Sequence, residues 1–327
     1  MVRMAEHDPP SEPYGADSVE PGQIPLRGWL VILRRVARRV VADKLSLYSA
    51  GVAFFAVLSV APVLLTALSV YGAINTPAQA LDHLSGVASL MPPALGDLVA
   101  DQLVSITAAS SQLLTVRGLL ALAVALGTAM TATTFLIDAL TVAYREQETR
   151  GMLHRSVLAL SFVLGGAVVL GAVITLSTLL SRLLSDAPTW VRVPVLLVVW
   201  IGFAALVALG VAVLYRFAPD RQGRARWRWI GGGATATTAL WLAASAGLFL
   251  YVANLGTYER TYGSLAGVAI SMFWLWLTIL LLVLGAVFNA ETERQTARDS
   301  TVGTERAPGQ RGAVVADDVP PYSQDPP

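Results

Sequence analysis

The chain has no cysteine among its 327 residues and only three histidines, His7, His83 and His154. The missing thiols exclude disulfides, thiolate catalysis and cysteine-ligated metals. The histidines are far apart in the sequence and lack the ligand spacing of a zinc hydrolase. A glycine-rich phosphate loop ending in lysine is also missing, which argues against nucleotide-driven pumping by this chain alone. We therefore expect no enzymatic activity, no metal site and no cofactor.

Charged residues are scarce as well. They make up 14% of the chain, whereas 55% of the residues are hydrophobic, and the mean hydropathy is +0.61. This balance is too apolar for an ordinary soluble domain and is typical of a protein that crosses a membrane several times. The net charge of +1 and the lack of a concentrated basic domain exclude a nucleic-acid partner.

Six runs are long and apolar enough to cross a bilayer as helices. They cover residues 45–72, 119–144, 156–184, 194–217, 230–253 and 263–290. The predicted fold is therefore an all-α polytopic membrane protein with six transmembrane helices. Residues 73–116 are too polar to span, so we expect short extracytoplasmic helices there, between spans 1 and 2.

Both ends of the chain have the composition of disordered segments, rich in Pro, Gly, Ser and charged residues. We expect a disordered tail at residues 1–25, a membrane domain at 26–291 and a second disordered tail at 292–327. Of the 23 Lys and Arg residues, 19 fall on the side of the two tails and four on the other. By the positive-inside rule, both termini are predicted to be cytoplasmic.

Before the first span, residues 26–44 combine apolar residues at helical spacing with a set of basic residues. The basic residues are Arg34, Arg35, Arg38 and Arg39. A basic amphipathic helix of this kind lies along a membrane surface with its arginines on anionic headgroups, which makes membrane lipids the expected partner. The alternative is a plain helix packed on the bundle.

The second span contains Asp138, the one carboxylate well inside an apolar run. Steps of three and four residues place Thr131, Thr134 and Thr141 on the same helical face. An ionisable group within a membrane helix is a candidate functional site, so this row is predicted to line an internal cavity and to contact the start of the fifth span. The alternative is purely structural, with hydrogen bonds to the same or a neighbouring helix.

The fifth span opens with three consecutive glycines, Gly231, Gly232 and Gly233. Small residues let two membrane helices approach closely, which is one interpretation. The other is an irregular or broken turn that faces a cavity, because such backbone is tolerated in a membrane only inside protein.

Three short sequences, SAGVAFF at 49–55 followed by LSVAP at 58–62, YGSL at 262–265 and GAVFNA at 285–290, resemble the YihY/BrkB family of bacterial inner-membrane proteins. The residues that carry the resemblance include Asp43, Pro62, Tyr262, Gly263, Gly285 and Asn289. The resemblance implies a six-span fold over residues 26–291 and a location in the bacterial plasma membrane. This family often has a glutamate where the present chain has Val287.

The resemblance says less about activity. Members of the family were once labelled ribonuclease, and some are linked to export of envelope lipids. Together with the Asp138 row and the three glycines, it favours a transporter or flippase-like protein for a lipid or other amphiphile of the cell envelope. The alternative is a non-transporting scaffold that binds envelope proteins or lipids, with a homo-oligomer or an envelope protein as partner.

Overall fold

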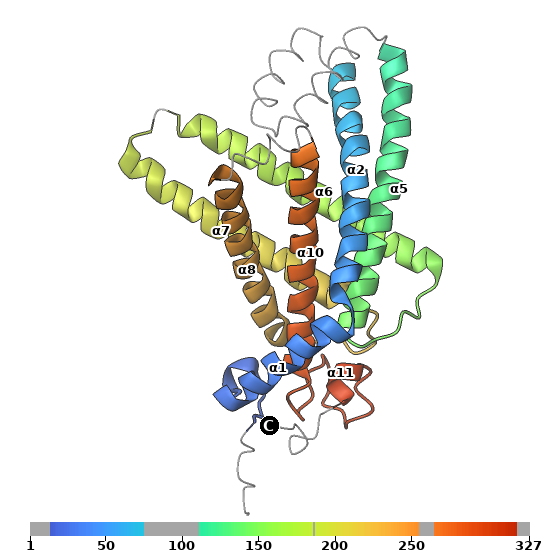
Figure 1. Ribbon diagram of the computed structural model, residues 1–327, viewed down its shortest axis with the longest axis vertical. Helices are drawn as coiled ribbons and strands as arrows, with labels where there is room; N and C mark the ends of the chain where they lie inside the picture. Colours follow the sequence, from blue (N-terminus) through green and yellow to red (C-terminus); the bar gives the residue numbers. More distant parts are fainter. Residues whose placement is uncertain (1–13, 75–110, 186, 255–264, 319–327) are drawn as a thin grey trace, which may run out of the picture.

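The computed structural model describes residues 14–74, 111–185, 187–254 and 265–318, and the regular structure in these ranges is helical (Figure 1). The long helices are α1 (Leu26–Ala42), α2 (Leu45–Ile74), α5 (Ser111–Ala143), α6 (Met152–Leu183), α7 (Thr189–Phe217), α8 (Trp227–Asn254) and α10 (Leu265–Glu293). Two short elements, η1 (Pro21–Gln23) and α11 (Val314–Asp317), lie in the terminal segments. The one pairing of extended backbone in the described residues is an isolated bridge between Ala225 and Thr301.

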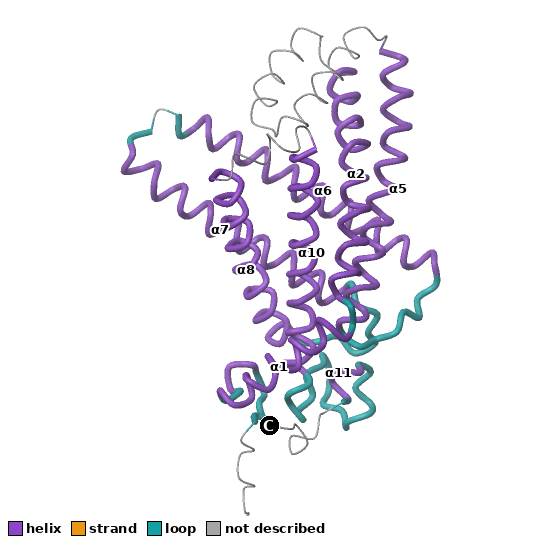
Figure 2. Tube along the Cα trace, viewed as in Figure 1, coloured by secondary structure: helices purple, strands orange, loops and turns teal. Residues whose placement is uncertain are grey.

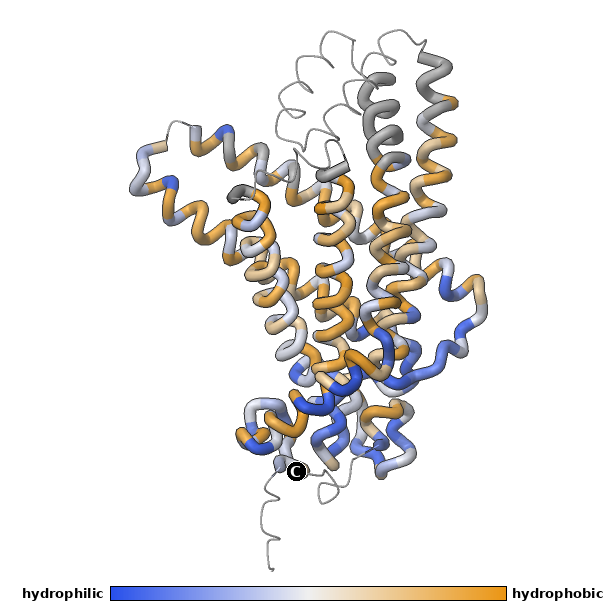
Figure 3. The backbone as a smooth tube through the Cα atoms, viewed as in Figure 1, coloured by the Kyte–Doolittle hydropathy of each residue, from blue (hydrophilic) through white to orange (hydrophobic). Residues whose placement is uncertain are grey.

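Five of these helices, α5, α6, α7, α8 and α10, contain segments long and apolar enough to cross a membrane. A sixth span is reached if α2 is counted together with α1, from which it is bent by 62°. Figure 3 shows apolar residues along the bundle and many of the hydrophilic residues at one end, where α1 and the segment around α11 lie. The protein is therefore an all-α polytopic membrane protein, as the sequence predicts.

The centre of the bundle is α10, which packs against α2 and α8 and, near its last turns, against α1 and α5. The pair α2 and α5 forms the longest helix contact. In Figures 1 and 2, α6 and α7 lean away from this centre, because α6 packs on α5 and α7 packs on α8 rather than on α10. Both leaning helices expose large apolar side chains such as Leu170 and Trp200, as expected of surfaces that face lipid.

Buried side chains concentrate at the hydrophilic end, which we call the basic end. They come from α1, α5, α7, α8 and α10 and include Ile32, Leu140, Tyr215, Trp229 and Val287. Trp29 of α1 stacks on Phe288 of α10 with ring centroids 5.6 Å apart. Packing thus fixes α1 across the end of α10, and the main cluster of buried apolar side chains lies at the basic end.

The terminal segments differ from the expected disorder. Residues 14–25 and 294–318 lie side by side at the basic end, and we call them together the polar cap. Ala297 donates its N–H to the Ala16 carbonyl at 2.7 Å, and the Gln295 side chain donates to the Tyr14 carbonyl at 2.8 Å. Hydrogen bonds to backbone carbonyls, from backbone and side-chain donors, hold these polar segments together. Both segments thus lie on one side of the bundle.

The helices expected between spans 1 and 2 fall mostly at residues 75–110, outside the described residues. The same holds for two residues of the family resemblance, Tyr262 and Gly263.

Candidate functional site

Asp138 lies near the basic end of α5, and its side chain is 33% exposed. It forms an ion pair with Arg155 on α6. The Nε atom of Arg155 lies 4.0 Å from Glu148, whose carboxylate accepts a 2.8 Å hydrogen bond from Arg150. Arg150 in turn lies 3.5 Å from Asp220. A chain of alternating charges therefore runs from α5, through the loop after it, to the loop between α7 and α8.

The threonines of the Asp138 row bond within their own helix. Thr131, Thr134 and Thr141 each donate to the carbonyl four residues earlier, at 2.8 to 2.9 Å. Such bonds satisfy the hydroxyl without a partner helix. Asp138 reaches α6 through Arg155, not the start of α8, so the structure does not bring it to the glycines as the sequence-based hypothesis had it.

The three glycines lie within α8, which continues through them without a break. Gly233 donates its N–H to Asn289 Oδ1 on α10 at 2.9 Å, and the Asn289 amide donates to the Ile230 carbonyl at 3.1 Å. A Cβ at Gly233 would lie 2.2 Å from that Oδ1, whereas a Cβ at Gly231 or Gly232 would meet nothing within 4 Å. Gly233 thus permits close helix approach, the first of the two interpretations.

A second close contact lies one turn along α10. The Tyr215 hydroxyl donates to the Leu282 carbonyl at 2.6 Å and lies 2.9 Å from Thr237 Oγ1. A Cβ at Gly285 would lie 1.7 Å from the same Thr237 oxygen. The motif residues Gly285 and Asn289 therefore serve helix packing, because each one accommodates a polar group of α8.

Glu291, which the sequence did not single out, is a fully buried carboxylate at the end of α10. Four guanidinium groups surround it, with Arg145 at 2.9 Å, Arg35 at 3.0 Å, Arg39 at 3.3 Å and Arg294 at 3.6 Å. We call these five residues the Glu291 cluster. It joins α1, the end of α5 and α10, and several charged partners are what a buried carboxylate needs to offset its lost hydration.

Two signals point to Glu291 in the sequence. It lies four residues after Val287, so it shares the helical face on which the family often has a glutamate. It is also the first charged residue after the last apolar run.

The four arginines predicted to bind headgroups divide into two pairs. Arg35 and Arg39 are buried in the Glu291 cluster, and Arg39 also bonds Asp43 and the Val142 and Ala143 carbonyls. Arg34 and Arg38 are exposed. The expectation of a packed helix is therefore met on one side of α1, and binding of headgroups by the exposed side stays a prediction.

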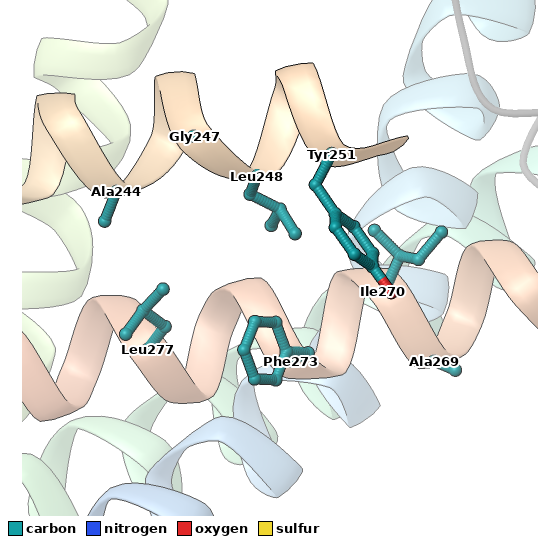
Figure 4. A pocket seen from close by; sticks show the side chains of 8 residues that line it. All are labelled: Ala244, Gly247, Leu248, Tyr251, Ala269, Ile270, Phe273 and Leu277. Carbon is teal, nitrogen blue, oxygen red and sulfur yellow. The ribbon is translucent and has the colours of Figure 1, made fainter. Parts of the chain in front are cut away.

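An apolar groove of about 450 Å³ lies between α8 and α10, in the halves of the two helices away from the basic end (Figure 4). Small residues, Ala244, Gly247 and Ala269, keep the helices' facing surfaces shallow. Larger side chains, Leu248, Tyr251, Ile270, Phe273 and Leu277, complete the lining. A groove of this size suits a small apolar group rather than a polar solute.

A polar hollow of about 830 Å³ lies at the basic end, between the loop after α5, the α7–α8 loop and residues 312–318. Burial opposes ionisation of Asp220, but two 2.6 Å hydrogen bonds from Thr149 hold its pKa below the usual value. Burial raises the pKa of Glu146, although its carboxylate accepts the Val314 N–H. The described residues contain no cluster of His, Asp or Glu able to hold a metal ion.

The chain was compared with known proteins. The family model for virulence factor BrkB matches residues 36–310, which includes most of the polar cap's C-terminal segment. Similar relatives include a "UPF0761 membrane protein" of Verminephrobacter eiseniae, 29% identical over 80% of this chain and 62% of the relative. Another, from Delftia acidovorans, is 28% identical over 87% of this chain and 66% of the relative.

The chain thus spans somewhat less than two thirds of the length of these two relatives. No solved structure matches. Because the family model covers most of the sequence, the chain belongs to the virulence factor BrkB family of membrane proteins.

Proposed function

We propose that this protein is a transporter or flippase-like protein for a lipid or other amphiphile, located in the bacterial plasma membrane with both termini in the cytoplasm. The observation that carries the proposal is the apolar groove between α8 and α10. It lies between two helices that qualify as membrane spans, which supports a position at the depth of lipid acyl chains. The excess of Lys and Arg at the basic end supports the orientation.

The hydrogen bonds between α8 and α10 support entry of an acyl chain at the groove. Near the basic end, Asn289 and Gly233 hold the two helices in close contact. Farther along, Trp241 donates to Thr278 at 3.2 Å and Trp274 donates to Ser245 at 3.2 Å. The groove lies alongside the second of these bonds, since Ala244 and Gly247 flank Ser245 in the sequence and Phe273 and Leu277 flank Trp274. An acyl chain entering from the bilayer would therefore lie between two helices that are held together toward the basic end.

The test is movement of a fluorescent phospholipid between leaflets of proteoliposomes, with and without an imposed proton gradient. Gly247→Trp fills the groove and should reduce the rate toward that of protein-free vesicles. Gly202→Trp on α7 is the matched control, since both glycines are exposed and a Cβ at either meets nothing within 4 Å. Rates that are the same for the unmodified protein and for empty vesicles would refute transport of that lipid.

The second candidate is a non-transporting scaffold, and the polar hollow favours it. A cavity lined by Arg145, Asp220 and Asp317 could receive a polar segment of an envelope protein or of a second copy of this chain. Crosslinking of a photoreactive amino acid at Gln222, which lines this hollow, to a second copy of this chain, without any lipid movement between leaflets, would favour this scaffold over the transporter. Neither proposal requires catalysis, a cofactor or a nucleic acid.

A further inference from the structure

The helix α1 presents three distinct faces. One is buried against the bundle and consists of Gly28, Ile32, Arg35, Val36 and Arg39. The apolar row is exposed and consists of Leu26, Leu30, Leu33, Ala37 and Val41. The basic row lies beside it, is also exposed and consists of Arg27, Arg34 and Arg38. Steps of three, four and seven residues keep each row on one side of the helix.

The exposure of the apolar row is large. Leu26 is 83% exposed, Leu30 68% and Val41 78%. These side chains lie on one continuous side of a helix whose opposite side is in the core. Water is a poor environment for such a row, since each large apolar side chain gains roughly 1.5 to 3 kcal/mol when it is buried.

The position of α1 identifies the cover as lipid. Only two residues separate α1 from α2, and the helices are bent by 62° relative to each other. Where α2 runs across the membrane, α1 must therefore run closer to the membrane plane, at the surface where the spans end. The basic row also fits a lipid surface, because it lies beside the apolar row just as anionic headgroups lie immediately above the acyl chains.

The buried face fixes how α1 is turned. Arg35 and Arg39 are held by Glu291, and Trp29 is held by Phe288, so the helix cannot roll about its axis without breaking these contacts. An isolated amphipathic peptide folds as it binds, and the conformational entropy that it loses on folding lowers its affinity. Here the helix is already formed and oriented, which removes that cost.

From these contacts we infer that α1 is a preformed binding site for anionic lipid, in which the apolar row enters the bilayer and the basic row binds the headgroups. Arg35 and Arg39 are not part of the site. The site lies on α1 and not in the groove, so it stands whether or not the protein moves lipid.

The test uses the full chain in proteoliposomes that contain phosphatidylglycerol. Because the native chain has no cysteine, Leu30→Cys carries a single fluorophore. Quenching by spin-labelled phosphatidylglycerol is compared with quenching by spin-labelled phosphatidylcholine. We expect a preference for phosphatidylglycerol that Arg27→Glu with Arg38→Glu reduces by at least roughly 25-fold, since each basic residue lost near an anionic surface is worth on the order of fivefold and the added glutamates repel the headgroups. High salt should weaken it too.

The matched control is Arg298→Glu with Arg306→Glu, which makes the same change in charge at exposed positions of the polar cap. This double variant should keep the preference. Equal quenching by the two lipids would overturn the proposal, and so would an absence of quenching by either. A disulfide-linked dimer through Leu30→Cys in membranes would instead show that a second copy covers the apolar row, which also overturns it.

Discussion

The carboxylates of Asp138 and Glu291 lie at the same end of the bundle but in contrasting surroundings. Asp138 is one-third exposed and has one arginine partner, Arg155 of the neighbouring helix. Glu291 has no exposed side-chain surface and has four arginines around it, drawn from three parts of the chain. The contrast teaches how a fully buried carboxylate can stay ionised here, because the four arginines offset the hydration that Glu291 loses when it is removed from water.

The two sites also differ in what they join. The pair of Asp138 and Arg155 links two helices that follow each other in the chain across a short loop. The Glu291 cluster links α1 to α10, which are separated by most of the sequence. Breaking the first site should loosen a hairpin, whereas breaking the second should release the first helix from the last.

The largest effect is therefore expected for Glu291→Gln. It leaves four buried or half-buried guanidinium groups without their common anion, and loss of one partner from a buried ion pair costs roughly 3 to 5 kcal/mol. Thermal unfolding in detergent measures the loss. Glu305→Gln, at an exposed position in the polar cap, is the control and should change little. If Glu291→Gln unfolds at the same temperature as the unmodified protein, Glu291 does not contribute more to stability than Asp138, and the contrast between the two carboxylates is wrong.

A smaller effect is expected on the arginine side of the cluster. Arg39→Gln removes charged hydrogen bonds to Glu291 and Asp43, which are worth roughly 1.5 to 3 kcal/mol. Arg38→Gln, one residue earlier on the exposed side of α1, should stay within roughly 0.5 kcal/mol. Chemical or thermal unfolding of the two variants sharpens the comparison. Equal losses would mean that the inward and outward faces of α1 contribute alike.

The smallest effect is expected at Asp138. Asp138→Asn keeps an acceptor for Arg155 and should leave the unfolding free energy nearly unchanged, whereas Asp138→Leu should lower it by roughly 1 kcal/mol. Unfolding in detergent is measured beside lipid movement in proteoliposomes. Loss of lipid movement in Asp138→Asn at normal stability would give this carboxylate a role in transport. The carboxylate that contributes less to stability would then be the functional one, which would break the comparison.

The long helices could be predicted from the sequence because apolar runs of membrane length have few other structures open to them. The positions of α5 and α8 follow from this argument. The pairing of Asp138 with Arg155 was within reach as well. A short loop makes α5 and α6 neighbours, so two opposite charges at similar distances from the loop face each other.

The partners of Glu291 and the hydrogen bonds of the polar cap were out of reach for a different reason. Arg35 and Glu291 are 256 residues apart in the sequence, and the periodicity of residues along a chain does not predict contacts at such a separation. Residues 294–318 have the composition of a disordered tail, but Arg311 donates to the Ala297 and Ala316 carbonyls at 2.6 and 2.7 Å. Amino-acid composition indicates how much apolar surface a segment can bury, but it does not predict hydrogen bonds of this kind.

The separation of Arg35 from Glu291 sets an order of events during synthesis. At roughly 5 to 20 residues per second, about 10 to 50 s pass between the appearance of the first of these residues and that of the second. Throughout that interval Arg35 and Arg39 lack Glu291, although Arg39 already has Asp43 and the carbonyls at the end of α5. The contacts that join α1 to α10 can form only after the last helix has been made, which distinguishes an unfinished protein from a complete one.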